Sequence, residues 1–252
     1  MSAAMYPIAR SQFQLACDEV HSWCARLDVP AETAARLYET LGPDERARCA
    51  RFRFERDRQR FIVARGVLRE LLALYFQTDP DRVSFVYSAF GKPDLGPEFG
   101  DRLKFNLSHS AELALIAVAV DSDVGVDLEY VRTEVECDEI ARSFFSAAEA
   151  DQITALPSDL RAEAFFGCWT KKEAYLKSRG ESLATALNTL AVPLTTGSAD
   201  HSSDVCVATN GGDAAKHWSL FTLRPAPGYI GALAVEGMGW RVSQRQWEMR
   251  PG

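Results

Sequence analysis

The sequence predicts an α+β protein built from two similar lobes. Its 252 residues are 47% hydrophobic and 25% charged, which suits a globular chain with a sizeable core. Segments with apolar residues at period two, typical of strands, alternate with segments of helical spacing. The same order of helix, short link, strand, loop and two neighbouring strands occurs in each half, although residue identity between the halves is negligible. We therefore expect an N-terminal lobe over residues 1–122 and a C-terminal lobe over 123–252, related by a pseudo-two-fold, with a ligand cleft between them.

The first half contains one long helix and several shorter elements. The helix is predicted over residues 55–75, because Phe61, Ala64 and Leu68 follow helical spacing. Ser108-His109-Ser110 is expected to be a loop between two strands. The other predicted elements are strands at 13–27, 83–87, 103–107 and 113–120, a helix at 31–41 and a further helical turn after Gly42.

The second half repeats this order with a second long helix. Ser146-x-x-Glu149 is a capping box, so we assign Glu149 a structural role rather than a catalytic one. The segment 195–216 is rich in Gly, Ser, Asp and Asn and is expected to be a surface loop. The predicted elements are strands at 124–129, 190–194, 218–223 and 231–236, and helices at 138–145, 147–156 and 160–179.

Two short stretches, residues 125–129 and 169–177, give the strongest indication of function. In the first, alternation at period two places the carboxylates of Asp127 and Glu129 on one face of a strand. In the second, Glu173 and Lys177 are four residues apart and share a helix face. Acids and a lysine on rigid elements suit Mg²⁺ together with a phosphate-bearing substrate.

Each stretch also has a simpler explanation. Glu173 and Lys177 could form an exposed i,i+4 salt bridge, and an Asp-x-Glu sequence could lie on a solvated strand edge. The apolar side of the helix, which includes Phe165, Trp169 and Leu176, continues to Glu173. A carboxylate on that side needs a cation or a hydrogen-bond donor to offset its desolvation, which favours the functional interpretation.

The charge distribution is uneven. The chain has a net charge of −7, but residues 43–70 contain nine arginines and five acids, so this window is +4 and the remainder is −11. Such a local positive segment indicates an anionic partner rather than general affinity for nucleic acid. A solvated helix whose arginines and acids pair with one another is an equally simple alternative.

Cysteine usage and hydropathy predict a cytoplasmic protein. The six cysteines form no Cys-x-x-Cys and have no histidine at zinc spacing, as is typical of thiols in a reducing compartment. No stretch approaches the roughly 18–20 apolar residues of a membrane span. Residues 1–10 lack the charged and apolar regions of a secretory signal.

The two stretches closely resemble the paired signature of the 4′-phosphopantetheinyl transferases. The family motifs G-x-D-x-E and W-x-x-K-E-A-x-x-K are matched at every fixed position. Upstream, Gly91-Lys92-Pro93 and Phe105-Asn106-Leu107-Ser108-His109-Ser110 follow in the family's order. Length favours the long, pseudo-dimeric, surfactin-synthetase-activating type over the short trimeric synthases. One departure is Ser182, where many members have the second glycine of G-x-G-L, which leaves acceptor preference open.

The resemblance implies transfer of phosphopantetheine from coenzyme A to a serine of an apo acyl or peptidyl carrier protein, with release of adenosine 3′,5′-bisphosphate. This is the reaction of a holo-[acyl-carrier-protein] synthase. By the same resemblance, Asp127, Glu129 and Glu173 hold Mg²⁺. Glu173 takes the serine proton and Lys177 neutralises the phosphate, while Trp169 has a structural role. The residues that the resemblance implies for coenzyme A binding are Arg48, Arg60, Arg65, Lys92, Ser108, His109, Asp127, Lys172 and Lys177.

Two other functions stay open: another Mg²⁺-dependent phosphotransferase or nucleotide hydrolase, and a non-catalytic binder of coenzyme A or nucleic acid. The sequence contains no Walker-type phosphate loop and no Gly-rich dinucleotide motif. The intact set of acids with Lys177 argues against mere binding. We expect fatty-acid, polyketide or peptide-synthetase carrier domains as partners, with no nucleic acid and no membrane. We also expect a monomer, because a fused two-lobed chain need not dimerise to complete its site.

Overall fold

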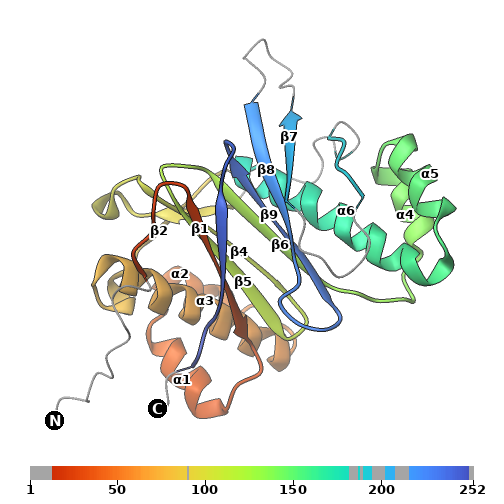
Figure 1. Cartoon of the computed structure of the whole chain (residues 1–252). Helices are drawn as coiled ribbons and strands as arrows, with labels where there is room; N and C mark the ends of the chain where they lie inside the picture. Colours follow the sequence, from red (N-terminus) through yellow and green to blue (C-terminus); the bar gives the residue numbers. More distant parts are fainter. Residues whose placement is uncertain are drawn as a thin grey trace.

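The computed structural model describes residues 13–89, 91–181, 187, 190–194, 202–207 and 216–249. Within them the chain forms a mixed α/β structure with two four-stranded sheets and one two-stranded sheet (Figure 1). The expected mixture of helices and strands is therefore confirmed. Among the described helices, none combines the length and hydrophobicity that a transmembrane span requires.

The first sheet has the strand order β10-β1-β5-β4. Its strands are β1 (Glu19–Arg26), β4 (Leu103–Ser110), β5 (Leu113–Val120) and β10 (Arg241–Gln246). β5 pairs antiparallel with both β1 and β4, whereas β10 runs parallel to β1. The helices α1 (Ala31–Glu39) and α3 (Glu55–Phe76) cover one face of this sheet, because their apolar residues join a shared core with it.

The second sheet has the order β6-β9-β8-β7 and is antiparallel throughout. Its strands are β6 (Val124–Tyr130), β7 (Ser202–Val207), β8 (Lys216–Leu223) and β9 (Tyr229–Glu236). The long helix α6 (Ser158–Arg179) packs across it, with α4 (Cys137–Phe144) and α5 (Ala147–Ala155) beside that helix. α6 ends at Gly180, whose φ of 67° is a left-handed conformation that glycine adopts without a steric penalty.

Three apolar clusters fix the order of the layers. One lies between α3 and the first sheet, and a second lies between α6 and the second sheet. The third joins the two sheets to each other, with Leu115 of β5 beside Val126 of β6 and Leu233 of β9. The layers are therefore helix, sheet, sheet and helix, as the arrangement in Figure 1 shows.

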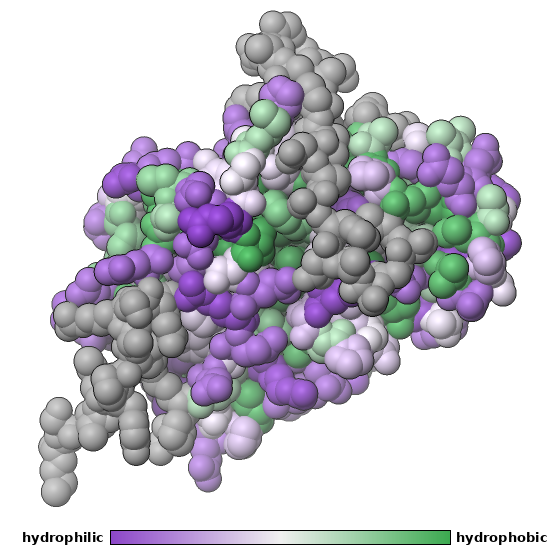
Figure 2. Space-filling view, viewed as in Figure 1, coloured by the Kyte–Doolittle hydropathy of each residue, from purple (hydrophilic) through white to green (hydrophobic). Residues whose placement is uncertain are grey.

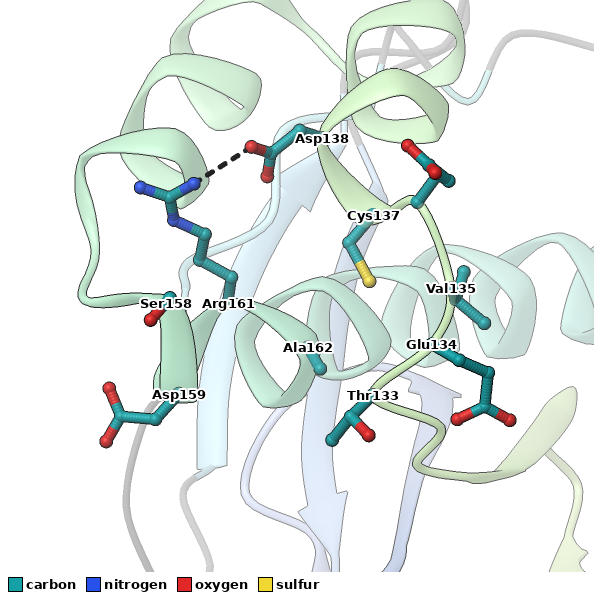
Figure 3. Close-up of a pocket in the computed structure, with 10 residues that line it drawn as sticks. Thr133, Glu134, Val135, Cys137, Asp138, Ser158, Asp159, Arg161 and Ala162 are labelled. Atoms are coloured by element: carbon teal, nitrogen blue, oxygen red, sulfur yellow. Dashed lines mark hydrogen bonds and ion pairs between the residues drawn. The ribbon is translucent and has the colours of Figure 1, made fainter.

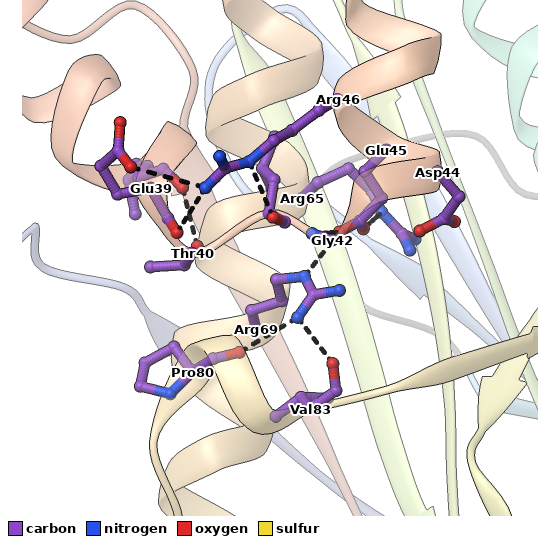
Figure 4. A network of polar contacts seen from close by, with 12 residues as sticks. Glu39, Thr40, Gly42, Asp44, Glu45, Arg46, Arg65, Arg69, Pro80 and Val83 are labelled. Atoms are coloured by element: carbon purple, nitrogen blue, oxygen red, sulfur yellow. Dashed lines mark hydrogen bonds and ion pairs between the residues drawn. The ribbon is translucent and has the colours of Figure 1, made fainter.

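A small polar core joins the helices α2 and α3 to the segment before β2. Glu45, on the short helix α2 (Pro43–Cys49), is buried and accepts hydrogen bonds from Arg65 at 2.5 Å and from Arg69 at 2.6 Å. Arg69 also donates to the carbonyls of Pro80 and Val83, just before the hairpin strands β2 (Phe85–Tyr87) and β3 (Pro93–Leu95) (Figure 4). These charges are paired in the interior, as buried charges require.

Three expectations about secondary structure are wrong, and one strand was missed. The segment 190–194 is not a strand, because side chains bind its backbone: Lys172 donates to the carbonyl of Leu190, and Val192 N–H donates to Glu149. The expected loop over 195–216 contains β7, although part of that range lies outside the described residues. Ser108-His109-Ser110 belongs to β4, and the turn follows it. The polar strand β10 was not expected.

Candidate active site

The site lies where the two sheets meet along β4 and β6. Alternate residues of β4 point to one face, and three of them bind β6. Asn106 Oδ1 accepts a hydrogen bond from the N–H of Val126 at 2.9 Å. Ser108 Oγ donates to Asp127 Oδ1 at 2.9 Å, and Ser110 binds the next acid, Glu129. The segment 105–110 on β4 and the segment 125–129 on β6 therefore lie side by side in register.

Helix α6 contributes Glu173 and Lys177 to the same place. Lys177 Nζ donates to Asp127 Oδ1 at 2.6 Å and to Ser108 Oγ at 3.0 Å. This contact requires the helix to approach β6 closely. Gly125 permits the approach, because a Cβ there would lie only 2.0 Å from the carbonyl oxygen of Ala174. The glycine of the first motif thus lets the second motif reach the acids.

Two carboxyl groups of the site, those of Glu173 and Glu129, have raised pKa values. Burial, followed by the negative charges of Asp127 and Glu129, raises the pKa of Glu173 to about 7, and the positive charge of Lys177 opposes this. Burial and then the charge of Asp127 also raise the pKa of Glu129. Glu173 is buried, as the apolar side of its helix indicates. A perturbed acid of this kind is typical of functional sites.

The donor set suits a divalent cation. Within the described residues, no group of three or more His, Cys, Asp or Glu side chains is arranged closely enough to hold a metal ion. Lys177 binds Oδ1 of Asp127, whereas Asp127 Oδ2 and Glu173 Oε1 are buried without a hydrogen-bond partner. Buried carboxylate oxygens need a donor or a cation, and Mg²⁺ prefers such oxygens. A divalent cation would satisfy these two oxygens once the acids draw closer together, and the Mg²⁺ site stays a prediction.

A cluster of positive charges surrounds His109. The imidazole lies at the end of β4 and reaches solvent. Desolvation and the positive charges of Lys177, Arg48 and Arg60 lower its pKa, and Asp127 opposes this. Arg60 is held by Asp28 through two hydrogen bonds of 2.9 and 3.1 Å. Arg48, Arg60 and Lys177 thus act electrostatically on His109, and the contact of these residues with coenzyme A stays a prediction.

Arg65 does not line the site, which corrects one predicted coenzyme A contact. Its guanidinium donates to Glu45 and to the hydroxyl of Tyr87, and it stacks over the ring of Phe85 at 4.5 Å. The side chain is 8% exposed. Arg65 therefore neutralises a buried acid within the first lobe (Figure 4).

Lys172 is a second correction. Its side chain is fully buried, and Nζ lies 3.0 Å from Glu149. It also donates to the carbonyls of Leu187 and Leu190. Glu149 in turn caps α5 through Ser146, as the sequence predicts. Lys172 thus joins α5, α6 and the segment after α6, and it has no free ammonium for a phosphate.

Lys92, just before β3, binds the end of helix α6. Its Nζ donates to the carbonyl of Ser178 at 2.7 Å, near the C-terminal end of α6, where the helix dipole favours a positive charge. Burial lowers the pKa of Lys92, and the negative charges of Asp123 and Asp94 oppose the shift. Its contact with coenzyme A stays a prediction.

A surface pocket of about 480 Å³ lies outside this cluster. It is lined by the segment after β6, from Thr133 to Asp138, and by the start of α6 around Arg161 (Figure 3). Arg161 pairs with Asp138 at 3.0 Å, and none of the predicted site residues lines the pocket. Near it, hydrophobic residues reach the surface in the region of α4, α5 and α6 (Figure 2), where Phe144 is 46% exposed.

Comparison with known families agrees with the motifs. Residues 123–234 match the family described as the 4′-phosphopantetheinyl transferase superfamily. Residues 30–121 match the family described as 4′-phosphopantetheinyl transferase, N-terminal. The similarity to one curated relative extends over most of the chain. This relative, the 4′-phosphopantetheinyl transferase HetI of Nostoc sp., is 40% identical over 90% of this chain and 92% of its own length. The protein therefore belongs to the 4′-phosphopantetheinyl transferase superfamily.

Two further relatives carry the same activity in their names. The 4′-phosphopantetheinyl transferase Sfp of Bacillus subtilis is 30% identical over 65% of this chain and 70% of its own. The 4′-phosphopantetheinyl transferase AcpT of Escherichia coli K12 is 32% identical over 50% of this chain and 60% of its own. The family resemblance inferred from the two motifs is therefore confirmed.

Sequence reasoning missed Ser110 as a contact of the acids. A signal was present, because Asn106, Ser108 and Ser110 form a polar series at period two that alternates with Phe105 and Leu107. Ending the predicted strand at Leu107 left Ser108 and Ser110 outside it and concealed the pattern.

Proposed function

We propose that this protein transfers 4′-phosphopantetheine from coenzyme A to a serine hydroxyl of an apo carrier protein in a Mg²⁺-dependent reaction. The observation that carries the proposal is the contact of Lys177 with Asp127 and Ser108, beside two buried carboxylate oxygens that lack partners. A cation and several acids at the meeting point of two lobes suit a pyrophosphate substrate with a metal ion. The family membership supports the same reaction.

Each residue of the cluster has a distinct proposed role. Asp127, Glu129 and Glu173 would hold Mg²⁺, which supplies positive charge to the pyrophosphate when bound. Glu173, with a pKa of about 7, is suited to accept the proton of the acceptor serine, directly or through water, near neutral pH. Lys177 would release Asp127 and neutralise the phosphate oxygens.

The nucleotide end of coenzyme A would bind to the first lobe. His109, Arg48 and Arg60 are proposed to bind the 3′-phosphate, since the positive charges of both arginines act on the imidazole of His109. A phosphate dianion there would favour the protonated imidazole and strengthen the contact. Ser108, Asp127 and Lys177 adjoin this group, and Lys92 stays a candidate for the adenosine side.

We further propose that the chain acts as two lobes within a monomer. The two family matches meet between residues 121 and 123, which supports lobes of 1–122 and 123–252. An approximate two-fold between them would relate the two four-stranded sheets with their long helices, although β10 returns to the first sheet. A cytoplasmic location is proposed from the cysteine pattern alone.

A transfer assay tests the reaction. The protein is incubated with coenzyme A, Mg²⁺ and a panel of apo carrier proteins from fatty-acid, polyketide and peptide-synthetase systems, and carrier mass is measured. We expect a gain of one phosphopantetheine group, and no gain on a carrier whose acceptor serine is replaced by alanine. Release of phosphate without carrier modification would favour a hydrolase or another phosphotransferase. Tight binding of coenzyme A without turnover would favour a non-catalytic binder.

The metal assignment has its own test. Asp127→Ala removes the oxygens that Ser108 and Lys177 contact, and it should abolish transfer while the melting temperature stays close to that of the wild type. Unchanged turnover by this variant would contradict the assignment.

A further inference from the structure

Ser110 binds the acid next to it on the neighbouring strand. Its Oγ donates to Glu129 Oε2 at 2.9 Å and accepts from the N–H of Tyr130 at 3.1 Å. A serine hydroxyl carries a single proton and can accept through its lone pairs. Because the backbone N–H can only donate, the proton of Ser110 is directed to the carboxylate of Glu129.

The simplest alternative is that Ser110 only joins β4 to β6. Asn106 does so at the other end of the seam, where it accepts from the backbone of Val126. Ser110 differs from Asn106 because its proton goes to a carboxylate of the site. Ser108 makes the equivalent contact with Asp127, so β4 presents one hydroxyl to each acid of β6 in matching register.

We infer that Ser110 is a positioning residue for Glu129: it holds one carboxylate oxygen so that the other is presented to the divalent cation. This inference rests on the proposed function, in which Glu129 is a metal ligand. Outer partners of this kind fix the orientation of metal ligands, and losing one typically weakens metal binding by about 10- to 100-fold. The inference goes beyond the roles that the resemblance implies, since these include Ser108 and His109 of the segment 105–110 but not Ser110.

Metal binding by the protein without coenzyme A provides the direct test. Mn²⁺ binding is measured by electron paramagnetic resonance for the wild type, Ser110→Ala and Ser110→Thr. We expect Ser110→Ala to raise the Kd for Mn²⁺ about tenfold, and Ser110→Thr, which keeps the hydroxyl, to stay near the wild type. A matched control is Ser84→Ala, which removes a serine hydroxyl that donates to Glu98 far from the acids of β6.

Transfer measured against Mg²⁺ concentration gives the second readout. In Ser110→Ala the Mg²⁺ concentration for half-maximal transfer should rise by a similar factor. A merely structural serine would lower the melting temperature without moving either metal constant, and that result would overturn the inference. If Ser110→Ala does not fold, Ser110→Cys replaces the hydroxyl with a weak donor and should show the same weakening. A wild type that binds no Mn²⁺ and transfers nothing would overturn the proposed function, and the role of Ser110 with it.

Discussion

Lys177 Nζ lies 2.6 Å from Asp127 Oδ1, so the last residue of the helix motif binds the central acid of the strand motif. The two residues are fifty positions apart in the chain. In this arrangement the ammonium supplies the positive charge that the acids need. A metal ion and Lys177 would therefore compete for the negative charge of the same carboxylate, and this competition leads to the first prediction.

Lys177→Met should strengthen metal binding and weaken transfer. The lysine side chain is 31% exposed, and an ion pair of that kind contributes about 0.5–1 kcal/mol, so the Kd for Mn²⁺ should fall about two- to fivefold. Transfer at saturating Mg²⁺ should fall at least about tenfold, because the phosphate loses its neutralising charge. Titration calorimetry and the transfer assay measure the two effects. A variant that lost both properties would show that Lys177 helps to build the metal site instead.

Gly125→Ala should separate β6 from α6. The added Cβ would lie 2.0 Å from the carbonyl of Ala174 and 2.5 Å from the N–H of Ser178, and backbone atoms cannot move aside easily. We expect a loss of about 1–3 kcal/mol in the free energy of unfolding, together with a loss of transfer. Urea denaturation measures the first. Gly100→Ala, where φ is 71° but no atom lies within 4 Å, is the control: it should lower stability through backbone strain and leave transfer intact.

The pair of Lys172 and Glu149 should contribute to stability rather than to substrate binding. Lys172→Ala leaves a buried carboxylate without its cation, and such changes typically cost about 3–5 kcal/mol. The KM for coenzyme A of the folded fraction should stay near the wild-type value. The double variant Lys172→Met with Glu149→Leu should recover part of the lost stability, since neither charge is left alone. A large rise in the KM for coenzyme A of Lys172→Ala without destabilisation would show instead that Lys172 contacts a phosphate of coenzyme A.

His21 should make stability depend on pH. This residue of β1 is fully buried, with the hydroxyl of Tyr75 from α3 at one ring nitrogen and the guanidinium of Arg245 at the other. Burial, then the charge of Arg245, lowers its pKa from 6.5 to about 4, against the opposing charge of Glu19. Because the pKa is lower in the folded state, protonation of His21 favours the unfolded chain. The contribution of neutral His21 to the free energy of unfolding is therefore complete above pH 6.5 and is lost as the pH falls towards 4.

The expected slope is at most about 1.4 kcal/mol per pH unit over that window. Urea unfolding of the wild type and of His21→Gln, measured between about pH 7 and about pH 4.5, checks it. His21→Gln should flatten the slope even though it lowers stability overall. The control His217→Gln removes an exposed imidazole from β8. Equal slopes in the wild type and His21→Gln would contradict the prediction.

Much of the fold and the grouping of the acids could be predicted, because the signals were local. Period-two alternation placed Asp127 and Glu129 on one face of β6, and helical spacing placed Glu173 and Lys177 together on α6. That β6 and α6 contribute to one site was predicted from the family resemblance rather than from periodicity. Nothing in the sequence indicated how near α6 comes to Gly125.

The errors arose where a residue's role depends on distant partners. Lys172 and Glu173 are adjacent, yet one residue turns a helix by about 100°, so the lysine points to α5 and the acid to β6. Arg65 lies among eight other arginines of one segment, and only its burial beside Glu45 distinguishes it. β10 reads as Arg-Val-Ser-Gln-Arg-Gln, and its polar composition gives little indication of a strand.

The parallel pairing of β10 with β1 also sets an order for folding during synthesis. β1 emerges early from the ribosome, whereas Arg241–Gln246 emerges only after every strand of the second sheet. Until then one edge of β1 presents unpaired backbone, which is prone to join strands of other chains. The first sheet therefore gains its edge strand β10 only after the strands described for the second sheet have been made.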